Sequence, residues 1–217
     1  MSGSDRVTCS IRTRRGRGKK RQIQRAVSGL PRHSVVLVED ETDLLLFPPL
    51  RAMWSPRGEP APLMITGHNA RRVVFGCMNL VSGHRVFLIR QRQRAQDFQE
   101  FLREVRRRYG QRHVAMLLDS DSSHIAARAQ ALAQRLQIRL LWLPKRSPEL
   151  NPMDTLWGQA KDAVCVNTQY ADIDQQADVF IAHLRSLSNR QALRTSGVLS
   201  KHFWLRRALS KNFCGPA

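Results

Sequence analysis

The sequence lacks long apolar runs and paired cysteines. No segment approaches the roughly 18 consecutive apolar residues of a membrane-spanning helix, and the Arg-rich N-terminus lacks the apolar core of a secretory signal. The four cysteines, Cys9, Cys77, Cys165 and Cys214, show none of the Cys/His spacings of a structural zinc site. We therefore expect reduced thiols in a protein of the cytoplasm that neither crosses a membrane nor uses structural zinc.

Acidic residues are also scarce. The chain has 36 Lys and Arg but only 17 Asp and Glu, which gives a formal net charge of +19. Such a charge attracts polyanions, and in a protein without membrane spans it favours DNA or RNA as the partner. Charge alone leaves open a solvated basic surface or a binder without chemistry, so it indicates the partner and not the reaction.

The length favours one domain. A chain of 217 residues can bury a substantial core, and this length is typical of one compact domain with a tail. Residues 1–33 contain ten Lys or Arg and one acid, with little apolar periodicity before Ile23. This segment is predicted to be a basic N-terminal arm.

Apolar runs and helical periodicity predict alternating strands and helices. Strands are predicted at residues 35–38, 72–78, 85–89, 114–118 and 139–143, with the second and third joined as a hairpin. Helices are predicted at residues 98–109, at 125–136, from Pro152 onward with Asn151 as N-cap, and at 173–187. A proline-rich irregular stretch follows the first strand. This α/β order, a mixed five-stranded sheet flanked by helices, is that of the ribonuclease H fold.

Three aspartates occupy matching positions in this order. Asp40 and Asp119 follow apolar strands, and Asp154 lies in the first turn of the helix that begins at Pro152. The first strand is expected at the centre of the sheet with the fourth beside it, so Asp40 and Asp119 would reach one edge, at the ends of adjacent strands, with Asp154 above them. A divalent cation would relieve the repulsion among these carboxylates. Ligation by oxygen alone favours Mg²⁺ or Mn²⁺, and two such ions can act on a phosphodiester.

Each aspartate also has a purely structural interpretation. Asp154 in a first turn would complement the helix dipole. Asp40, with acids on both sides, would belong to a solvated turn, and Asp119 would be a turn residue. The metal-site interpretation depends on the three occurring together.

Three further residues are candidates for contact with nucleic acid. Lys145 and Arg146 precede the third aspartate closely enough to bind DNA phosphates, and a solvated loop is the alternative. His124 follows the second aspartate and would orient a ligand or contact a phosphate. A structural role at the start of a helix is the commoner one for such a histidine.

At these residues the chain resembles the DDE/DDD transposases of the mariner superfamily, in particular their bacterial insertion-sequence relatives. The resemblance covers about residues 34–210 and rests on three stretches: VEDET at 38–42, LDSDSSH at 118–124 and LPKRSPELNPMDTLW at 143–157. The third is the most specific, and the 34 residues between Asp119 and Asp154 are typical of the superfamily. By this resemblance Asp40, Asp119 and Asp154 take the three metal-ligand positions, although the bacterial relatives usually have Glu at the third.

The resemblance implies a ribonuclease H-like catalytic domain over residues 34–210, followed by a tail at 211–217. Its expected function is cleavage of DNA at element ends and transfer of the 3′ end to target DNA, by in-line attack on phosphodiesters with two Mg²⁺ or Mn²⁺ ions. A homodimer is expected when active, in the cytoplasm at the nucleoid. Family members carry helix-turn-helix domains before the first acid. We therefore expect residues 1–33 to be the remnant of such a region, or a separate helix-turn-helix polypeptide to supply it.

Two alternatives remain open from the sequence. The first is a truncated, non-catalytic DNA-binding remnant of a transposase, in which the fold and the basic surface persist without activity. The second is a ribonuclease H-like nuclease that cuts RNA:DNA hybrids, although the third stretch argues against it.

Overall fold

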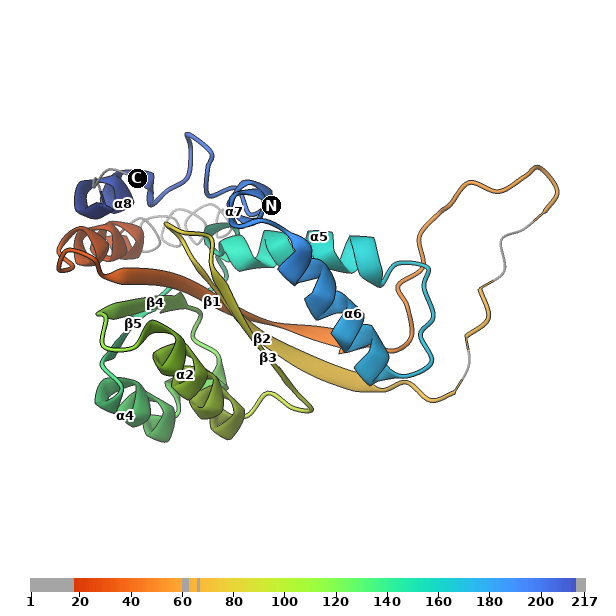
Figure 1. Ribbon diagram of the computed structural model, residues 1–217, viewed down its shortest axis with the longest axis horizontal. Helices are drawn as coiled ribbons and strands as arrows, with labels where there is room; N and C mark the ends of the chain where they lie inside the picture. The colour runs from red at the N-terminus through yellow and green to blue at the C-terminus, as the bar shows by residue number, and fades with distance from the viewer. Residues whose placement is uncertain (1–17, 60–62, 66, 214–217) are drawn as a thin grey trace, which may run out of the picture.

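The computed structural model describes residues 18–59, 63–65 and 67–213, and it shows a five-stranded mixed sheet between two layers of helices (Figure 1). The strands are β1 (Val35–Leu45), β2 (Arg71–Asn79), β3 (Arg85–Arg90), β4 (Val114–Leu118) and β5 (Ile138–Trp142). Their order across the sheet is β3-β2-β1-β4-β5, with β1 in the centre. The predicted mixed sheet of five strands is therefore confirmed.

The register of β1 with its two neighbours positions the candidate site. β2 pairs antiparallel with β1 along Leu37–Leu45, whereas β4 pairs parallel with β1 only as far as Val38 and Leu117. Continued by two residues, the second register brings Asp119 level with Asp40. The two predicted neighbours, the first and fourth strands, do lie side by side.

Helices cover both faces of the sheet (Figure 1). The helices are α2 (Ala95–Tyr109), α3 (Ser122–Ile125), α4 (Ala127–Arg135), α5 (Pro152–Val164), α6 (Ile173–Ser186), α7 (Asn189–Thr195) and α8 (Arg206–Phe213), with a short 3₁₀ helix at Pro148–Leu150. In Figure 1, α2 and α4 lie below the sheet, and α5 and α6 lie above it. The predicted stop of α2 is confirmed, because Gly110 follows it with a φ of 54°, a value that glycine adopts readily.

The sheet separates two apolar cores, and the alternation of β1 supplies both. Val36 and Val38 face a core that includes α5 and α6, whereas Val35 and Leu37 face a core that includes α2. Successive side chains of a strand point to opposite faces, so a run of four valines and leucines is buried on both sides. The acids that follow this run are distributed over the two faces in the same way.

The first strand is longer than predicted. The expected strand, residues 35–38, ended just before Asp40, but β1 continues to Leu45, because β2 pairs with it from Leu37 to Leu45. Asp40 therefore lies inside the strand, opposite Gly76, and not at its end. The apolar run marked only the part of β1 that is buried on both faces.

Two helical segments also differ from the prediction. The helix expected at residues 125–136 is divided into α3 and α4, with the backbone extended at Ala126. Residues 18–28, within the predicted basic arm, form a helix whose Ile23 and Val27 are buried in the core. The rest of that arm before residue 18 lies outside the described residues.

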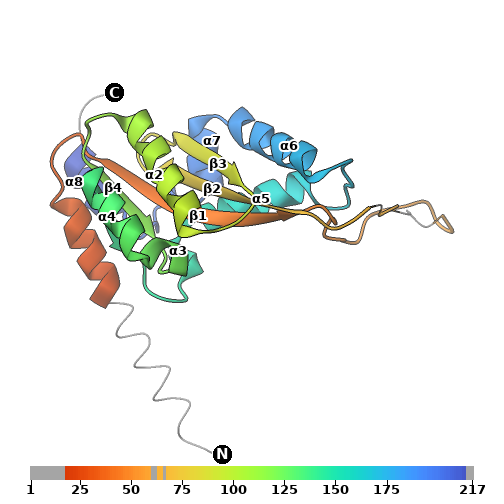
Figure 2. The ribbon, with the colours of Figure 1, turned by 90° about the horizontal axis from the view of Figure 1, so that it is seen from below.

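The last helix runs into the segment that was predicted to be a tail. α8 continues to Phe213, into the predicted tail at 211–217, and residues 214–217 lie outside the described part. Trp204, in the apolar cluster before α8, donates a hydrogen bond from Nε1 to the carbonyl of Leu150 and accepts one at its own carbonyl from Gln24. The first helix and the C-terminal segment thus pack together beside the start of α5, as Figure 2 also shows for the first helix and α8.

The connection between β1 and β2 extends away from the body of the molecule (Figures 1 and 2). Its described residues contain no helix or strand beyond the ends of β1 and β2, as the proline-rich sequence predicted. Asn167 fixes the near end of this connection, because its side chain accepts from the Arg51 N–H at 2.9 Å and donates to the Arg51 carbonyl at 3.0 Å. Arg51 also pairs with Asp162 at 2.8 Å.

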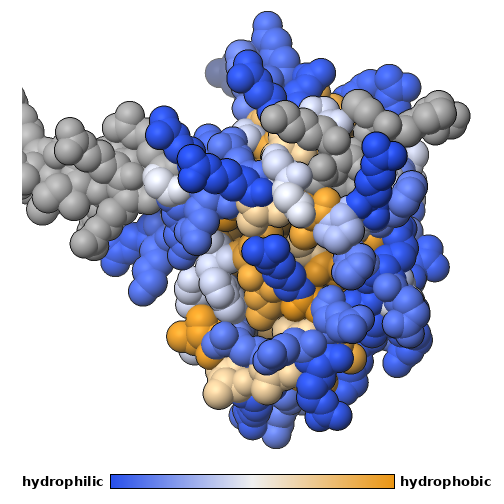
Figure 3. Space-filling model, turned by 90° about the vertical axis from the view of Figure 1, so that its left-hand side faces the viewer, coloured by the Kyte–Doolittle hydropathy of each residue, from blue (hydrophilic) through white to orange (hydrophobic). Residues whose placement is uncertain are grey.

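The face of the molecule in Figure 3 is mostly hydrophilic. Figure 3 shows one face, where hydrophilic side chains surround a smaller area of hydrophobic ones. Within the described residues, no helix has the length and apolar character needed to cross a membrane. Cys77 and Cys165 are buried free thiols, as expected, whereas Cys9 and Cys214 lie outside the described residues.

Candidate active site

Three aspartates from separate parts of the chain line one pocket. Asp40 comes from β1, Asp119 follows β4, and Asp154 lies in the first turn of α5. The pocket has a volume of about 430 Å³ and lies where β4 ends beside the continuing β1. The structure thus brings together the three carboxylates that the sequence analysis singled out.

The start of α5 is fixed directly beside β1. The Asn151 side chain accepts a hydrogen bond from the Met153 N–H at 3.1 Å, which makes it the N-cap of the helix, as predicted. The same side chain donates to the carbonyl of Glu39 at 3.1 Å. One buried asparagine therefore caps α5 and ties it to the residue before Asp40, which sets the position of Asp154.

Trp157 holds α5 down on the sheet. Its indole lies over Gly76 in β2, and its ring centroid is 5.8 Å from that of Phe87 and 6.0 Å from that of Phe180. Gly76 pairs with Asp40 across the strands, so a side chain at position 76 would occupy the space of the indole. The glycine permits a close approach of helix and sheet beside the aspartates.

The carboxyl group of Asp40 is in a place that disfavours its charged form. Burial and the negative charges of Glu41, Asp119 and Asp154 together raise the pKa of Asp40 to about 8. Among the described residues, no hydrogen bond or ion pair reaches the carboxylate of Asp40 or Asp154. Both features disfavour an ionised Asp40, and a bound divalent cation would remove that penalty.

Asp119 differs because a histidine supports it. His124 Nδ1 lies 3.0 Å from Asp119 Oδ1, and the backbone N–H of Asp121 donates to the same oxygen at 2.9 Å. The hydrogen bond from His124 lowers the pKa of Asp119. The second carboxylate oxygen, Oδ2, receives no hydrogen bond from the described residues.

His124 is enclosed and does not reach the surface. Its side chain is 1% exposed, and its other nitrogen, Nε2, lies 2.7 Å from Glu41 Oε1. Burial acts to lower its pKa, but the charge of Glu39 and the hydrogen bonds to Asp119 and Glu41 raise that pKa to about 11. Direct phosphate contact by His124, as predicted from the sequence, would require one of these contacts to break, because both ring nitrogens are engaged inside the protein. Orientation of Asp119 is the role that its contacts permit.

Sequence reasoning did not assign a role to Glu39 or Glu41, which lie on the face of β1 opposite Asp40. Glu39 is 0% exposed, and neither of its carboxylate oxygens has a hydrogen-bond partner among the described residues. Burial and the charge of Glu41 raise the pKa of Glu39 well above its ordinary value. Ligand atoms of Glu39, Glu41 and His124 lie within 4.8 Å of one another, so this group is a second place to consider for a cation. The alternation of acids at positions 39 and 41 was the available signal.

The loop between β5 and α5 forms the opposite wall of the pocket. Lys145 and Arg146 line it, together with Ser147 and Pro148. Arg146 has a φ of 55°, an uncommon conformation for a residue other than glycine, and such conformations are concentrated at functional sites. Both basic side chains are exposed beside the carboxylates, as expected of residues that contact a phosphate.

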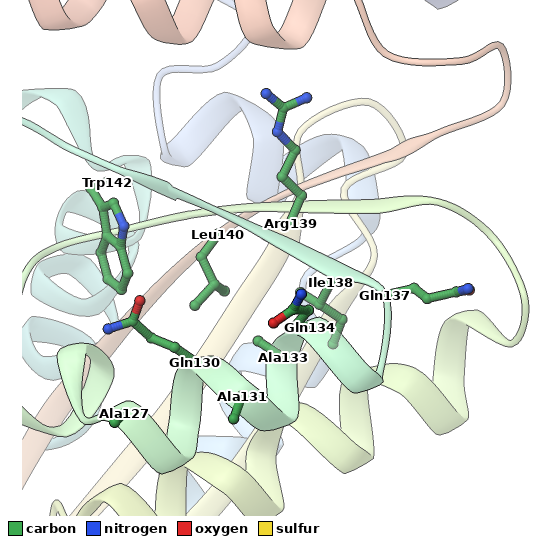
Figure 4. A pocket seen from close by; sticks show the side chains of 10 residues that line it. All are labelled: Ala127, Gln130, Ala131, Ala133, Gln134, Gln137, Ile138, Arg139, Leu140 and Trp142. Carbon is green, nitrogen blue, oxygen red and sulfur yellow. The ribbon is translucent and has the colours of Figure 1, made fainter.

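A larger hollow lies elsewhere and has a different chemistry. Its volume is about 730 Å³, and it is an open hollow lined by α4 and the edge strand β5 (Figure 4). In Figure 4, Gln130 and Trp142 lie near each other on one side, whereas Arg139 points away from the cavity. None of the side chains that line it is acidic. It cannot hold a divalent cation through carboxylates, so the smaller acidic pocket is the better candidate for phosphodiester chemistry.

The acidic pocket has the donor set of a divalent-cation site. Its candidate ligands are carboxylate oxygens from Asp40, Asp119 and Asp154, which suits Mg²⁺ or Mn²⁺ better than Zn²⁺. Asp40 has no hydrogen-bond or ion-pair partner within the described residues, and Asp119 keeps one oxygen without a hydrogen bond. These three residues would hold the ion. The positive charges of the lysine and arginine on the facing loop would attract an anionic substrate to the same pocket.

Comparisons with known proteins agree on one group of relatives. The model of the DDE superfamily endonuclease family matches residues 35–177. An uncharacterized 39 kDa protein of insertion element IS630 from Shigella sonnei is 23% identical over 159 residues, which cover 72% of this chain and 46% of that protein. The chain therefore spans about half the length of this curated relative.

Solved structures of one transposase share the fold. The mariner Mos1 paired-end complex with Mg is similar with a TM-score of 0.67 and 16% identity, over 91% of this chain and 61% of that one. The catalytic domain of Mos1 mariner transposase is similar with a TM-score of 0.61 and 15% identity, over 91% of this chain and 92% of that one. The ribonuclease H-like fold expected from the sequence is thereby confirmed.

The family match covers the sheet, the pocket and most of the helices that carry them, from the start of β1 into α6. It contains all three aspartates and the loop that faces them. The chain belongs to the DDE superfamily endonuclease family.

Proposed function

We propose that this chain is the catalytic domain of an insertion-sequence transposase, which cleaves DNA at element ends and transfers the 3′ end to target DNA. One observation carries the proposal: Asp40, Asp119 and Asp154, from three separate segments, line a single pocket that also contains Lys145 and Arg146. Carboxylates beside exposed cations suit a site that binds metal and phosphate together.

The proposed role of the three aspartates is to hold the metal. Two Mg²⁺ or Mn²⁺ ions, when bound, would activate the attacking water or hydroxyl and stabilise the leaving oxygen of an in-line displacement. Asp40 and Asp119 approach from the sheet, and Asp154 approaches from α5, so the carboxylates surround the position where the phosphate would react. No protein side chain is needed as a covalent nucleophile.

The proposed role of Lys145 and Arg146 is to hold the DNA backbone. Both side chains are exposed on the loop that faces the aspartates, so a phosphate bound there would lie next to the metal ligands. Such contacts position a substrate but do not read its sequence. A Mos1 transposase paired-end complex with the left transposon end has a similar fold, which supports DNA as the substrate class.

The proposal extends to the organisation of the protein. Residues 34–210 would form the catalytic domain, with the helix at residues 18–28 packed on it and α8 closing it. Sequence-specific binding of element ends would come from a helix-turn-helix region outside this domain or from a separate polypeptide. The active form would be a homodimer acting on DNA in the cytoplasm, at the nucleoid.

Nicking of supercoiled plasmid DNA by the purified protein tests the proposal. With Mg²⁺ or Mn²⁺ we expect conversion to open circles, which stops when a chelator is added and when Asp119 is replaced in Asp119→Asn. The matched control is Asp178→Asn, an exposed aspartate of α6, which should leave nicking unchanged. Cutting that survives Asp119→Asn would refute the assigned site.

The same assay separates the alternatives. A DNA-binding remnant would bind the plasmid but would not cut it in the presence of either Mg²⁺ or Mn²⁺. A hybrid-specific nuclease would cut RNA:DNA duplexes in preference to DNA and would not join a 3′-hydroxyl oligonucleotide to the plasmid. The proposal requires both cutting and joining of DNA.

A further inference from the structure

Asp119 is the end of a chain of three side chains that begins on the central strand. Glu41 Oε1 lies 2.7 Å from His124 Nε2, and His124 Nδ1 lies 3.0 Å from Asp119 Oδ1. The imidazole thus lies between two carboxylates from different elements, β1 and the segment after β4. Each carboxylate can only accept, so each contact uses an N–H of the ring.

The chain is assembled by local features of the sequence. Glu41 faces away from Asp40 because successive strand residues point to opposite faces. The side chain of Asp121 caps the short α3 by accepting from the Ser123 N–H at 2.8 Å, which turns the backbone so that His124 faces Asp119. The strand and the capped turn together fix both ends of the chain.

Packing keeps the imidazole in place. The ring centroid of His124 lies 4.4 Å from that of Phe98, and the histidine is 1% exposed. The side chain of Glu41 is 8% exposed. A side chain enclosed in this way has few alternative rotamers, so it can impose an orientation on its partner.

The two oxygens of Asp119 are therefore not equivalent. Oδ1 accepts from His124 and from the backbone N–H of Asp121, at 3.0 and 2.9 Å. Oδ2 receives no hydrogen bond from the described residues, and Asp119 lines the pocket shared with Asp40 and Asp154. Because Oδ1 accepts two hydrogen bonds, the orientation of the carboxylate is fixed, and Oδ2 is the oxygen left for the pocket.

We infer that His124 and Glu41 are positioning residues that orient the Asp119 carboxylate for metal binding. The inference rests on the proposed function, because it assigns Asp119 as a ligand. His124 acts through its hydrogen bond to Oδ1, and Glu41 acts by holding the imidazole from the other side. Partners of this kind behind a metal ligand contribute roughly 10- to 100-fold to metal affinity.

The same residues have a competing interpretation as a separate cation site with Glu39. Both nitrogens of His124 already contact carboxylate oxygens, so a cation could bind the ring only after one of these contacts was broken. The distance from His124 Nε2 to Glu39 Oε2 is 3.6 Å, longer than the contact to Glu41. The observed hydrogen bonds favour positioning.

Binding of Mn²⁺ to the full chain without DNA tests the inference, measured by electron paramagnetic resonance or titration calorimetry. His124→Ala should weaken binding about 10- to 100-fold, and Glu41→Ala should weaken it less, by about 10-fold. His124→Asn retains an N–H donor near the position of Nδ1 and should bind nearly as wild type. His124→Gln places its donor toward Glu41 instead and should bind as weakly as the alanine variant.

A control separates positioning from stability. Val105→Ala removes buried volume from α2 in the same core, without touching the chain of contacts, and should lower stability but not Mn²⁺ affinity. Equal affinities of His124→Ala and the wild-type protein would overturn the inference. Equal losses in His124→Asn and His124→Gln would overturn it as well, because a purely space-filling role does not distinguish the two.

Nitrogen-15 NMR of the metal-free protein distinguishes this failure from failure of the proposed function. We expect two slowly exchanging ring N–H signals from His124, with the Nδ1 signal changed selectively by Asp119→Asn. Absence of these signals would refute the chain of contacts while plasmid nicking still supports cleavage. A wild-type protein that shows the signals but neither binds Mn²⁺ nor nicks DNA would refute both proposals, since there would be no metal to position.

Discussion

Replacement of Gly76 by alanine gives the most specific test of how α5 is held over the sheet. A Cβ at position 76 would lie 2.5 Å from Cη2 and 2.6 Å from Cζ2 of Trp157, and 3.0 Å from Cδ1 of Phe87. Trp157 is 3% exposed, and it packs between Phe87 and Phe180. The indole therefore has no free space to move into, and the helix or the strand must shift.

The expected cost follows from two opposing contributions. Overpacking of a rigid buried contact costs up to about 3 kcal/mol. Replacing glycine within a strand recovers roughly 0.5–1 kcal/mol of backbone entropy. The free energy of unfolding of Gly76→Ala should therefore fall by about 2 kcal/mol, and the melting temperature by about 4–8 °C for a chain of this length.

Thermal and denaturant unfolding, followed by circular dichroism, measures this change. Gly158→Ala is the matched control, because Gly158 is exposed on the same α5 and a Cβ there meets nothing within 4 Å. That substitution should stabilise the protein by roughly 0.5–1 kcal/mol. Similar effects of the two alanines would contradict the described packing.

A double-mutant cycle identifies the contact responsible. Trp157→Phe removes the indole carbons that a Cβ at position 76 would meet, so Gly76→Ala should cost less in that background. We expect a coupling of about 1–2 kcal/mol, within the range found for residues in contact. If the effects of Gly76→Ala and Trp157→Phe were additive, the indole of Trp157 would not be the group that excludes a side chain at position 76. Because Asp154 lies less than one turn before Trp157 on α5, the single Gly76→Ala change should also slow DNA cleavage.

Three other variants test the anchoring of α5 and the contact with DNA. Asn151→Ala should lower the free energy of unfolding by about 1–2 kcal/mol through loss of the helix cap, and it should also reduce cleavage, because Asp154 loses its fixed position. Asp172→Ala removes the cap of α6, where its side chain accepts from two backbone N–H groups at 2.8 and 2.9 Å. It should cost a similar amount in urea unfolding yet leave cleavage per folded molecule unchanged, and an equal loss of activity in both variants would contradict the assignment. Combined Lys145→Ala and Arg146→Ala changes should weaken DNA binding and reduce the slope of log K against log salt by about 2, as fluorescence anisotropy across a salt series would measure. An unchanged slope would mean that residues other than Lys145 and Arg146 bind the DNA phosphates.

Most of the fold could be predicted because most strands and helices have a local signal in the sequence, such as an apolar run or a capping residue. The strand Val114–Leu118 and the N-cap at Asn151 were found at their true positions, since one is a short apolar run and the other a preferred capping residue. The end of β1 was missed because its second half is held by pairing with β2, which no local pattern reveals. The first helix was missed because its few apolar residues are buried by contact with remote segments.

The candidate site was predictable only in part. The three aspartates stand out by their positions after strands and at a helix start, and the structure brings them into one pocket. The role of Glu41 depends on which face of β1 it occupies, which required the true length of the strand. The burial of His124 depends on Phe98 from a distant helix, so its exposure could not be read from neighbouring residues.

The central claim is that Asp40, Asp119 and Asp154 together bind the catalytic metal. Crystals soaked in Mn²⁺, examined by anomalous diffraction, test it most directly. An anomalous peak is expected about 2.1 Å from carboxylate oxygens in the pocket lined by all three aspartates. A peak among Glu39, Glu41 and His124, with none in that pocket, would contradict it.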